Sequence, residues 1–188
     1  MQLEQGKCFH VYNRANSDND KLFVTANNYL YFLKKYHEYM ALHWDTLSYC
    51  LLPNHFHLFV RIHENCDMKK ARQSFKNFLN CYAKSFNKAH GRRGSLFQKN
   101  AKALHVADVS YYQSLVRYIH RNPLKHKIVT DLDNWMFSSY FNFLGLKNDP
   151  CIENTSILSV FDSVRHFKNF VHADDPQEMV LKELLFEE

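Results

Sequence analysis

The 188-residue sequence is poor in the residues that build linkers, disulfide frameworks and membrane anchors. It has only 4 glycines and 4 prolines, which argues against long flexible or low-complexity segments. Its 5 cysteines are scattered without a CxxC pair, so we expect reduced thiols and neither disulfides nor a zinc knuckle. No apolar run reaches membrane-spanning length, and the first residues lack a signal-peptide core. We therefore expect a soluble, cytoplasmic protein with no membrane partner.

Aromatic residues and positive charge are what the sequence has in excess. It contains 16 Phe and 11 Tyr, and 46% of its residues are hydrophobic, enough for the core of one domain. The formal net charge is +5, which fits a nucleic-acid partner without identifying one.

Hydrophobic periodicity predicts an alternation of strands and helices over the first two thirds of the chain. The third helix should end near Asn122, because Pro123 follows it. The order β-α-β-β-α-β-α predicts an α+β fold, a ferredoxin-like split βαβ antiparallel sheet with helices on one face. The expected strands cover about residues 7–14, 44–52, 55–62 and 96–106, and the expected helices about 26–42, 67–90 and 108–122.

The remaining sequence has weaker periodicity and suggests a second, smaller unit. We expect one or two helices within residues 155–170 and another within 178–186. The predicted domains are therefore residues 1–145, which carry the candidate chemistry, and a helical extension at 146–188.

Two histidines in the third predicted strand form the first candidate site. His55 and His57 flank Phe56, so in a strand the two imidazoles share one sheet face while Phe56 points into the core. Paired imidazoles are half of a metal site, and they are costly to bury without partners. An HxH pair is also common as an ordinary pair of hydrogen-bonded histidines.

The third predicted helix supplies the other half of the site. Tyr118 and Asn122 are four residues apart, so they share one helix face. An amide oxygen can ligate a hard cation, and a tyrosine hydroxyl can act as a nucleophile. If this face lies over the two histidines, three neutral ligands could hold Mg²⁺ or Mn²⁺ with positions open for phosphate oxygens. Tyr111 and Tyr112 are rival nucleophiles, but neither has a ligand-type residue four positions later.

Several segments together resemble the single-tyrosine HUH transposases, the insertion-sequence-200-like and REP-associated tyrosine transposases. The segment PNHFHL at 53–58 resembles the HUH motif, in which U is a bulky hydrophobe, and YIHRNP at 118–123 resembles the tyrosine helix. Further matches are HVYNR at 10–14, LFQK at 96–99 and WMFSSY at 135–140, so the resemblance covers about residues 8–145.

The resemblance implies an enzyme that cuts and rejoins single-stranded DNA at hairpin-flanked sites through a 5′-phosphotyrosine intermediate. It implies Tyr118 as nucleophile, and His55, His57 and Asn122 as ligands of Mg²⁺ or Mn²⁺. Many relatives carry Gln at the position of Asn122, whose side chain is one methylene shorter. The helical extension is more similar to the REP-associated branch than to the minimal transposases, which form dimers. The expected partners are single-stranded or hairpin DNA and a second copy of the chain.

Basic and aromatic residues outside this set are candidates for DNA contact. Aromatic side chains among Phe97, Tyr111 and Tyr112 could stack on unpaired bases. Nine basic residues could line a phosphate path: Arg14, Lys84, Arg92, Arg93, Lys99, Lys102, Arg117, Arg121 and Lys125.

Three alternatives remain open at this point. A domesticated nuclease that processes repeated palindromes would use the same chemistry, so the sequence does not separate it from a transposase. A non-catalytic nucleic-acid-binding module would not need His55, His57, Tyr118 and Asn122 together. A zinc hydrolase would need a nearby carboxylate or a third histidine at suitable spacing.

Overall fold

A four-stranded antiparallel sheet forms the centre of the protein, in a computed structural model that describes residues 2–17, 20–153 and 155–173. The strand order β2-β3-β1-β4, with one helix after β1 and one after β3, confirms the predicted ferredoxin-like α+β fold. The strands are β1 (Cys8–Arg14), β2 (Trp44–Leu52), β3 (His55–Ile62) and β4 (Lys102–His105).

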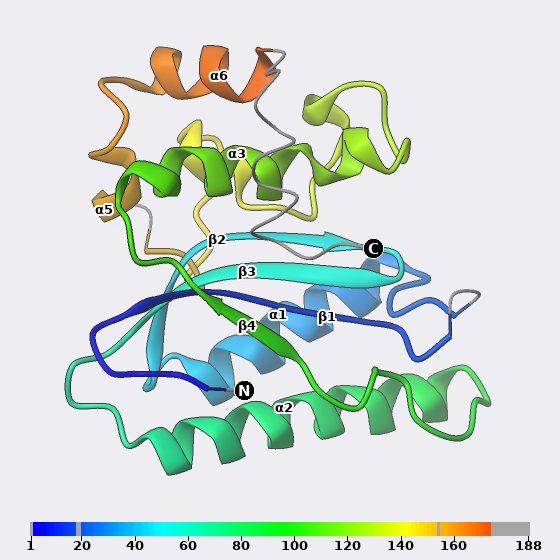
Figure 1. Cartoon of the computed structure of the whole chain (residues 1–188). Helices are drawn as coiled ribbons and strands as arrows, with labels where there is room; N and C mark the ends of the chain where they lie inside the picture. The colour runs from blue at the N-terminus through cyan, green and yellow to red at the C-terminus, as the bar shows by residue number, and fades with distance from the viewer. Residues whose placement is uncertain (1, 18–19, 154, 174–188) are drawn as a thin grey trace.

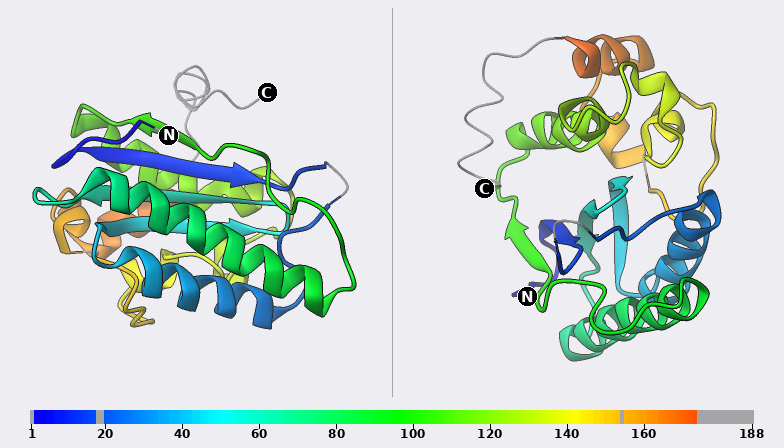
Figure 2. Two further views of the ribbon diagram at one scale, coloured as in Figure 1. Left: turned by 90° about the horizontal axis from the view of Figure 1, so that it is seen from below. Right: turned by 90° about the vertical axis from the view of Figure 1, so that its right-hand side faces the viewer.

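Helices α1 (Ala26–Met40) and α2 (Met68–Ala89) cover one face of the sheet (Figures 1 and 2). The Asp67 side chain accepts hydrogen bonds from the first backbone N–H groups of α2, which fixes where that helix begins. Between these helices and the sheet lies an aromatic core in which Phe32 packs against both Phe56 and Phe78. The predicted core role of Phe56 is confirmed, since its side chain is fully buried there.

A third helix and the C-terminal helices cover the opposite face (Figure 2, right). Helix α3 (Ser110–Lys125) packs on β2 and β3, and its apolar residues join a second core that includes Phe143 and Phe167. The prediction of helices within residues 155–170 is borne out by two short helices, whereas residues 178–186 lie outside the described part. The short elements are η1 (Leu132–Asn134), α4 (Tyr140–Phe143), α5 (Thr155–Leu158) and α6 (Val164–His172).

Two predicted boundaries are wrong. The sequence predicts the fourth strand over 96–106, but Leu96 and Phe97 are buried in the core, and Phe97 forms an isolated bridge with Ala15, just after β1. The regular ladder then resumes at β4. Helix α3 continues past Pro123 to Lys125, because the His126 N–H still bonds to the Asn122 carbonyl and closes the last turn behind the proline.

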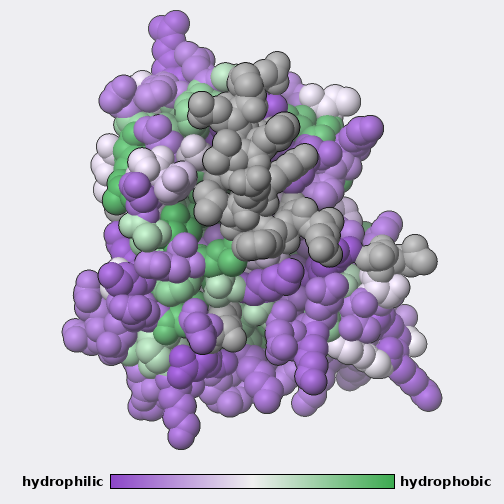
Figure 3. All heavy atoms as spheres, in the orientation of Figure 1, coloured by the Kyte–Doolittle hydropathy of each residue, from purple (hydrophilic) through white to green (hydrophobic). Residues whose placement is uncertain are grey.

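The outer surface of α2 is polar. Hydrophilic side chains cover most of the lower part of the face in Figure 3, over α2. The lysines of this helix lie on a solvated helix face, and contact of Lys84 with DNA stays a prediction. Among the described residues, no helix is both long and apolar enough to cross a bilayer.

Candidate active site

The register of β1 and β3 places a set of polar side chains on the sheet face beneath α3. Tyr12 pairs with His57, and Arg14 pairs with His55. Because side chains alternate along a strand, His10, two residues before Tyr12, lies on the same face. His55 and His57 share this face as predicted, with ring centroids 5.1 Å apart and planes nearly perpendicular.

His57 is almost completely buried in this face. Its Nδ1 atom lies 2.9 Å from Nε2 of His10, and the two rings are stacked with centroids 5.1 Å apart. Burial holds the pKa of His57 well below its usual range, and the neighbouring His10 and His55 lower it further. His57 is therefore a neutral ring, the form in which imidazole ligates a metal.

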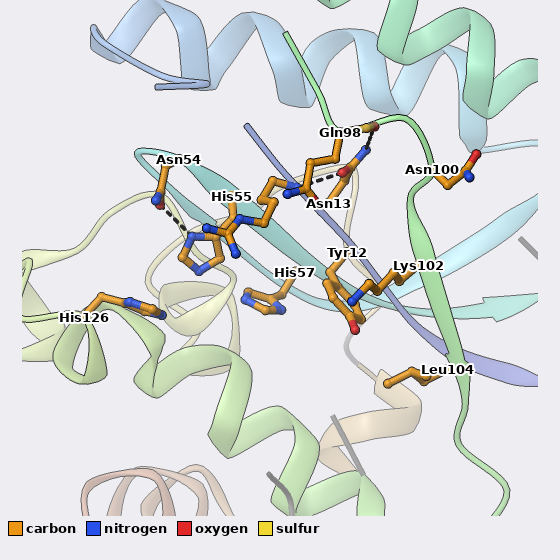
Figure 4. A pocket seen from close by; sticks show the side chains of 11 residues that line it. Tyr12, Asn13, Asn54, His55, His57, Gln98, Asn100, Lys102, Leu104 and His126 are labelled. Atoms are coloured by element: carbon orange, nitrogen blue, oxygen red, sulfur yellow. Dashed lines mark hydrogen bonds between the residues drawn. The ribbon is translucent and has the colours of Figure 1, made fainter. Parts of the chain in front are cut away.

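His55 is half-buried and sits where the site meets solvent. Its Nδ1 atom donates a hydrogen bond to the Asn54 side-chain oxygen, 2.7 Å away. On its other side lies His126, with ring centroids 4.7 Å apart. In Figure 4 the imidazoles of His55, His57 and His126 converge at one end of a pocket.

Helix α3 brings Tyr118 to this histidine cluster, as the residue spacing predicted. The Tyr118 ring is edge-on to His57 and His10, at centroid distances of 5.6 and 6.1 Å, and only 3% of the residue is exposed. The Lys125 ammonium lies 4.9 Å from the centre of the Tyr118 ring. Tyr118 and His57 meet within a single chain, so assembling this site needs no second copy; a homodimer stays a prediction.

Asn122 lies one helical turn after Tyr118 and one turn before His126, on the same face of α3. It is fully buried, and its amide nitrogen donates to the Tyr118 carbonyl at 2.9 Å. Its side-chain oxygen is buried and accepts no hydrogen bond from the residues that the structure describes. A buried oxygen without a donor is costly unless something else binds it, and a cation would do so.

The donor set of the site fits a hard divalent cation bound to phosphate. His55, His57 and Asn122 would supply neutral ligands, and among the described residues no carboxylate lines the pocket. A cation held by neutral ligands keeps its full charge for phosphate oxygens. Within the described ranges, no three His, Cys, Asp or Glu residues are arranged to hold a metal ion, a finding that does not test a set containing an amide.

The pocket beside the histidines has a volume of about 750 Å³ and opens between β1, β3 and β4 (Figure 4). Two of the basic residues predicted to contact DNA, Arg14 and Lys102, line it. Neither Tyr118 nor Asn122 belongs to its lining, since both are buried on the side of α3 that packs on the sheet. The lining residues are Tyr12, Asn13, Arg14, Asn54, His55, His57, Gln98, Asn100, Lys102, Leu104 and His126.

Two arginines of α3 that are predicted to bind DNA, Arg117 and Arg121, contact the C-terminal end of α6. Arg117 donates to the Ala173 carbonyl and lies 5.2 Å from the centre of the Phe170 ring. Arg121 donates to the carbonyls of residues 171–173. Cationic groups are favourable at a helix C-terminus, so both arginines hold the end of α6 against α3.

The other predicted contact residues are not part of the pocket lining. The Arg92 side chain binds Asp20 and the Ser95 carbonyl, while Lys84, Arg93 and Lys99 are exposed. Phe97 is buried in the core, which removes it as a base-stacking residue. Tyr112 packs edge-on against Phe59 at 5.0 Å, leaving Tyr111 as the exposed aromatic of the three.

His120 has a structural role in α3. It points away from Tyr118, and its Nε2 atom lies 2.8 Å from the Ser139 hydroxyl. Burial lowers the pKa of His120 to about 3, so it is a neutral hydrogen-bonding residue.

Sequence reasoning missed two histidines of the cluster. His126 follows Asn122 by four residues, but a helix expected to stop at Asn122 hid this spacing. His10 lies on the face of Tyr12 and Arg14, but only the pairing of β1 with β3 brings it to His57. Alternation in the first strand indicates only that His10, Tyr12 and Arg14 share one face of the sheet.

The sequence and the fold of the chain are similar to those of known proteins. The family model described as "Transposase IS200 like" matches residues 21–122, more than half of the chain and a span that includes both β3 histidines, Tyr118 and Asn122. A protein described as "Putative REP-associated tyrosine transposase" from Haemophilus influenzae is 28% identical over 104 residues. That match covers 52% of this chain and 59% of the relative, so it spans less than two thirds of the relative's length.

A solved structure, described as a REP-associated tyrosine transposase bound to a REP hairpin, has the same fold. It superposes with a TM-score of 0.60 at 20% sequence identity. The superposition covers 82% of this chain and 91% of that one.

Proposed function

Because the chain belongs to the IS200-like transposase family, we propose that it cleaves and rejoins single-stranded DNA beside a hairpin through Tyr118. The observation that carries the proposal is the approach of Tyr118, on α3, to His57 on β3, at one end of a pocket lined by Arg14 and Lys102. A nucleophile, neutral cation ligands and phosphate-binding cations thus meet at one place.

The proposed reaction is a phosphoryl transfer to the tyrosine. The Tyr118 hydroxyl oxygen forms a bond to phosphorus and gives up its proton, and the bond from phosphorus to the 3′ oxygen breaks. The leaving 3′ oxygen takes a proton, and the 5′ side remains attached as a phosphotyrosine. Mg²⁺ or Mn²⁺, held by His55, His57 and Asn122, would supply charge stabilisation on the phosphate. Rejoining is the reverse transfer, to the 3′ hydroxyl of another strand.

The burial of Tyr118 sets a condition on this reaction. With 3% of the residue exposed, its hydroxyl meets a phosphate in the pocket only after α3 or the side chain shifts. The Lys125 ammonium, 4.9 Å from the centre of the Tyr118 ring, is placed to meet an incoming phosphate.

We propose hairpin DNA as the substrate because of how two similar proteins are described. One solved protein of the same fold holds a REP hairpin, and the curated relative is described as REP-associated. Arg14 and Lys102 on one rim of the pocket would position the strand next to the hairpin through its phosphates.

The test is an adduct assay on an oligonucleotide with a hairpin and a labelled single-stranded flank, with Mg²⁺ and with a chelator. We expect a covalent protein–DNA adduct that requires the cation. Tyr118→Phe should lower cleavage by at least about 10⁴-fold, because the nucleophile is removed. DNA binding should stay near the wild-type level.

Tyr111→Phe is the matched control, since Tyr111 is an exposed tyrosine of the same helix. It should leave the adduct yield unchanged. An adduct that persists in Tyr118→Phe would overturn the assignment of the nucleophile. Tight binding without any cleavage would favour a non-catalytic binding module.

A further inference from the structure

The hydrogen bond of His55 fixes which of its ring nitrogens can bind a cation. Its Nδ1 atom lies 2.7 Å from the side-chain oxygen of Asn54 (Figure 4). An amide oxygen only accepts hydrogen bonds, so this Nδ1 carries the hydrogen. In a neutral ring the lone pair is then on Nε2, which is the atom available for ligation.

The corresponding bond of His57 leads to another histidine. Its Nδ1 atom lies 2.9 Å from Nε2 of His10, a residue of β1 that is 1% exposed. One hydrogen lies between the two nitrogens, so two arrangements exist. If the hydrogen belongs to His57, the His57 lone pair is on Nε2, as in His55. If it belongs to His10, the Nε2 of His57 carries a hydrogen and cannot ligate a cation.

We propose that His10 is a positioning residue that accepts the hydrogen bond from Nδ1–H of His57 and so fixes the tautomer in which His57 binds the cation through Nε2. This role rests on the proposed function, since the cation is the one assigned to His55 and His57. Asn54 then accepts a hydrogen bond from Nδ1–H of His55, and His10 accepts one from Nδ1–H of His57. Asn54 precedes His55 in the sequence, whereas His10 lies on the neighbouring strand β1.

The choice of a histidine as acceptor has a physical reason. Partners of metal-bound histidines orient the ring and raise its basicity, and carboxylates often serve. At this buried place a carboxylate would bring a charge that must be desolvated. A neutral imidazole accepts the same hydrogen bond and leaves the charge of the site to the cation and the phosphate.

A packing role for His10 is the competing explanation, because its ring also stacks on Tyr12 at 4.9 Å. Two amide variants separate the explanations. In His10→Gln the amide group reaches the place of Nε2, so its oxygen can accept from His57. In His10→Asn the amide group reaches only the place of Nδ1 and leaves His57 without this acceptor. Both variants lose the ring, so packing alone predicts equal effects.

The first measurement is the tautomer of His57 in ¹⁵N-labelled, metal-free protein, from long-range ¹H–¹⁵N correlations. The His57 signals are assigned by their loss in His57→Gln. We expect the Nδ1–H form in the wild type and in His10→Gln, and a shift toward the Nε2–H form in His10→Asn. An Nε2–H form in the wild type, or no change in His10→Asn, would overturn the proposal.

The second measurement is Mn²⁺ binding, followed by electron paramagnetic resonance, with thermal melts to show that both variants fold. His10→Asn should bind Mn²⁺ about 10- to 100-fold more weakly, while His10→Gln stays close to the wild type. Equal binding by His10→Asn and the wild type overturns the role of His10 alone. A wild-type protein that binds no Mn²⁺ overturns the ligand set of the proposed function together with this role.

Discussion

The two faces of the sheet come from alternate residues of the same strands, yet they bury different chemistry. The face under α1 and α2 buries Phe56 among aromatic rings, whereas the face under α3 buries His10 and His57, and Asn122 of α3 is buried on the same side. Apolar burial stabilises the fold, while buried polar groups cost free energy unless they are bound. One face therefore provides apolar burial that stabilises the sheet, and the other carries the residues that we propose act on DNA.

Of the variants considered, Phe56→Ala should have the largest effect, a loss of stability from the apolar face. Removing a fully buried phenyl ring should lower the free energy of unfolding by about 4 kcal/mol, because the core is left with a cavity. The neighbouring His55→Ala, on the other face and half-buried, should cost less than about 1 kcal/mol. Urea unfolding followed by circular dichroism measures both. Similar losses for the two variants would show that the histidine face also determines stability.

The apolar face was the easier one to predict from the sequence. Alternation places Phe56 opposite His55 and His57, and the bounds of β2 and β3 follow from turn residues at Pro53 and Asn54. The polar face depends on which strands pair, and no local pattern gives that information. The sequence therefore does not predict His10, which only the pairing of β1 with β3 brings to His57, or the contacts of Arg117 and Arg121 with the end of α6.

Asn122→Ala should affect the polar face without damaging the aromatic one. Loss of the amide oxygen should weaken Mn²⁺ binding by up to about 100-fold, because one of three proposed ligands is gone. Asn122→Asp, which keeps an oxygen and adds a charge, should bind at least as well as the wild type.

Asn100→Ala is the control for that prediction, since Asn100 is an exposed amide on the pocket rim. Its Mn²⁺ affinity, measured by electron paramagnetic resonance, should equal that of the wild type. If Asn122→Ala also binds normally, His126 becomes the next candidate for a third ligand.

Arg121→Ala addresses the outer side of α3. Its guanidinium binds the carbonyl groups at the end of α6, so its loss should lower the free energy of unfolding by about 2 kcal/mol. The salt dependence of DNA binding should not change. A smaller salt slope with unchanged stability would return Arg121 to the DNA-binding set.

Lys102→Ala should have the smallest effect of these variants. It tests which face of the protein binds DNA. Lys102 is exposed on β4 at the pocket, and its ammonium lies 5.7 Å from the centre of the Tyr12 ring. Losing one phosphate contact should weaken single-stranded DNA binding by about 1 kcal/mol and reduce the salt slope by about 0.7. Lys76→Ala, an exposed lysine on the outer face of α2, should change neither quantity. If Lys76→Ala instead had the larger effect in fluorescence anisotropy titrations at several salt concentrations, the strand would run over the α2 surface. The polar face under α3 would then not be where DNA is held.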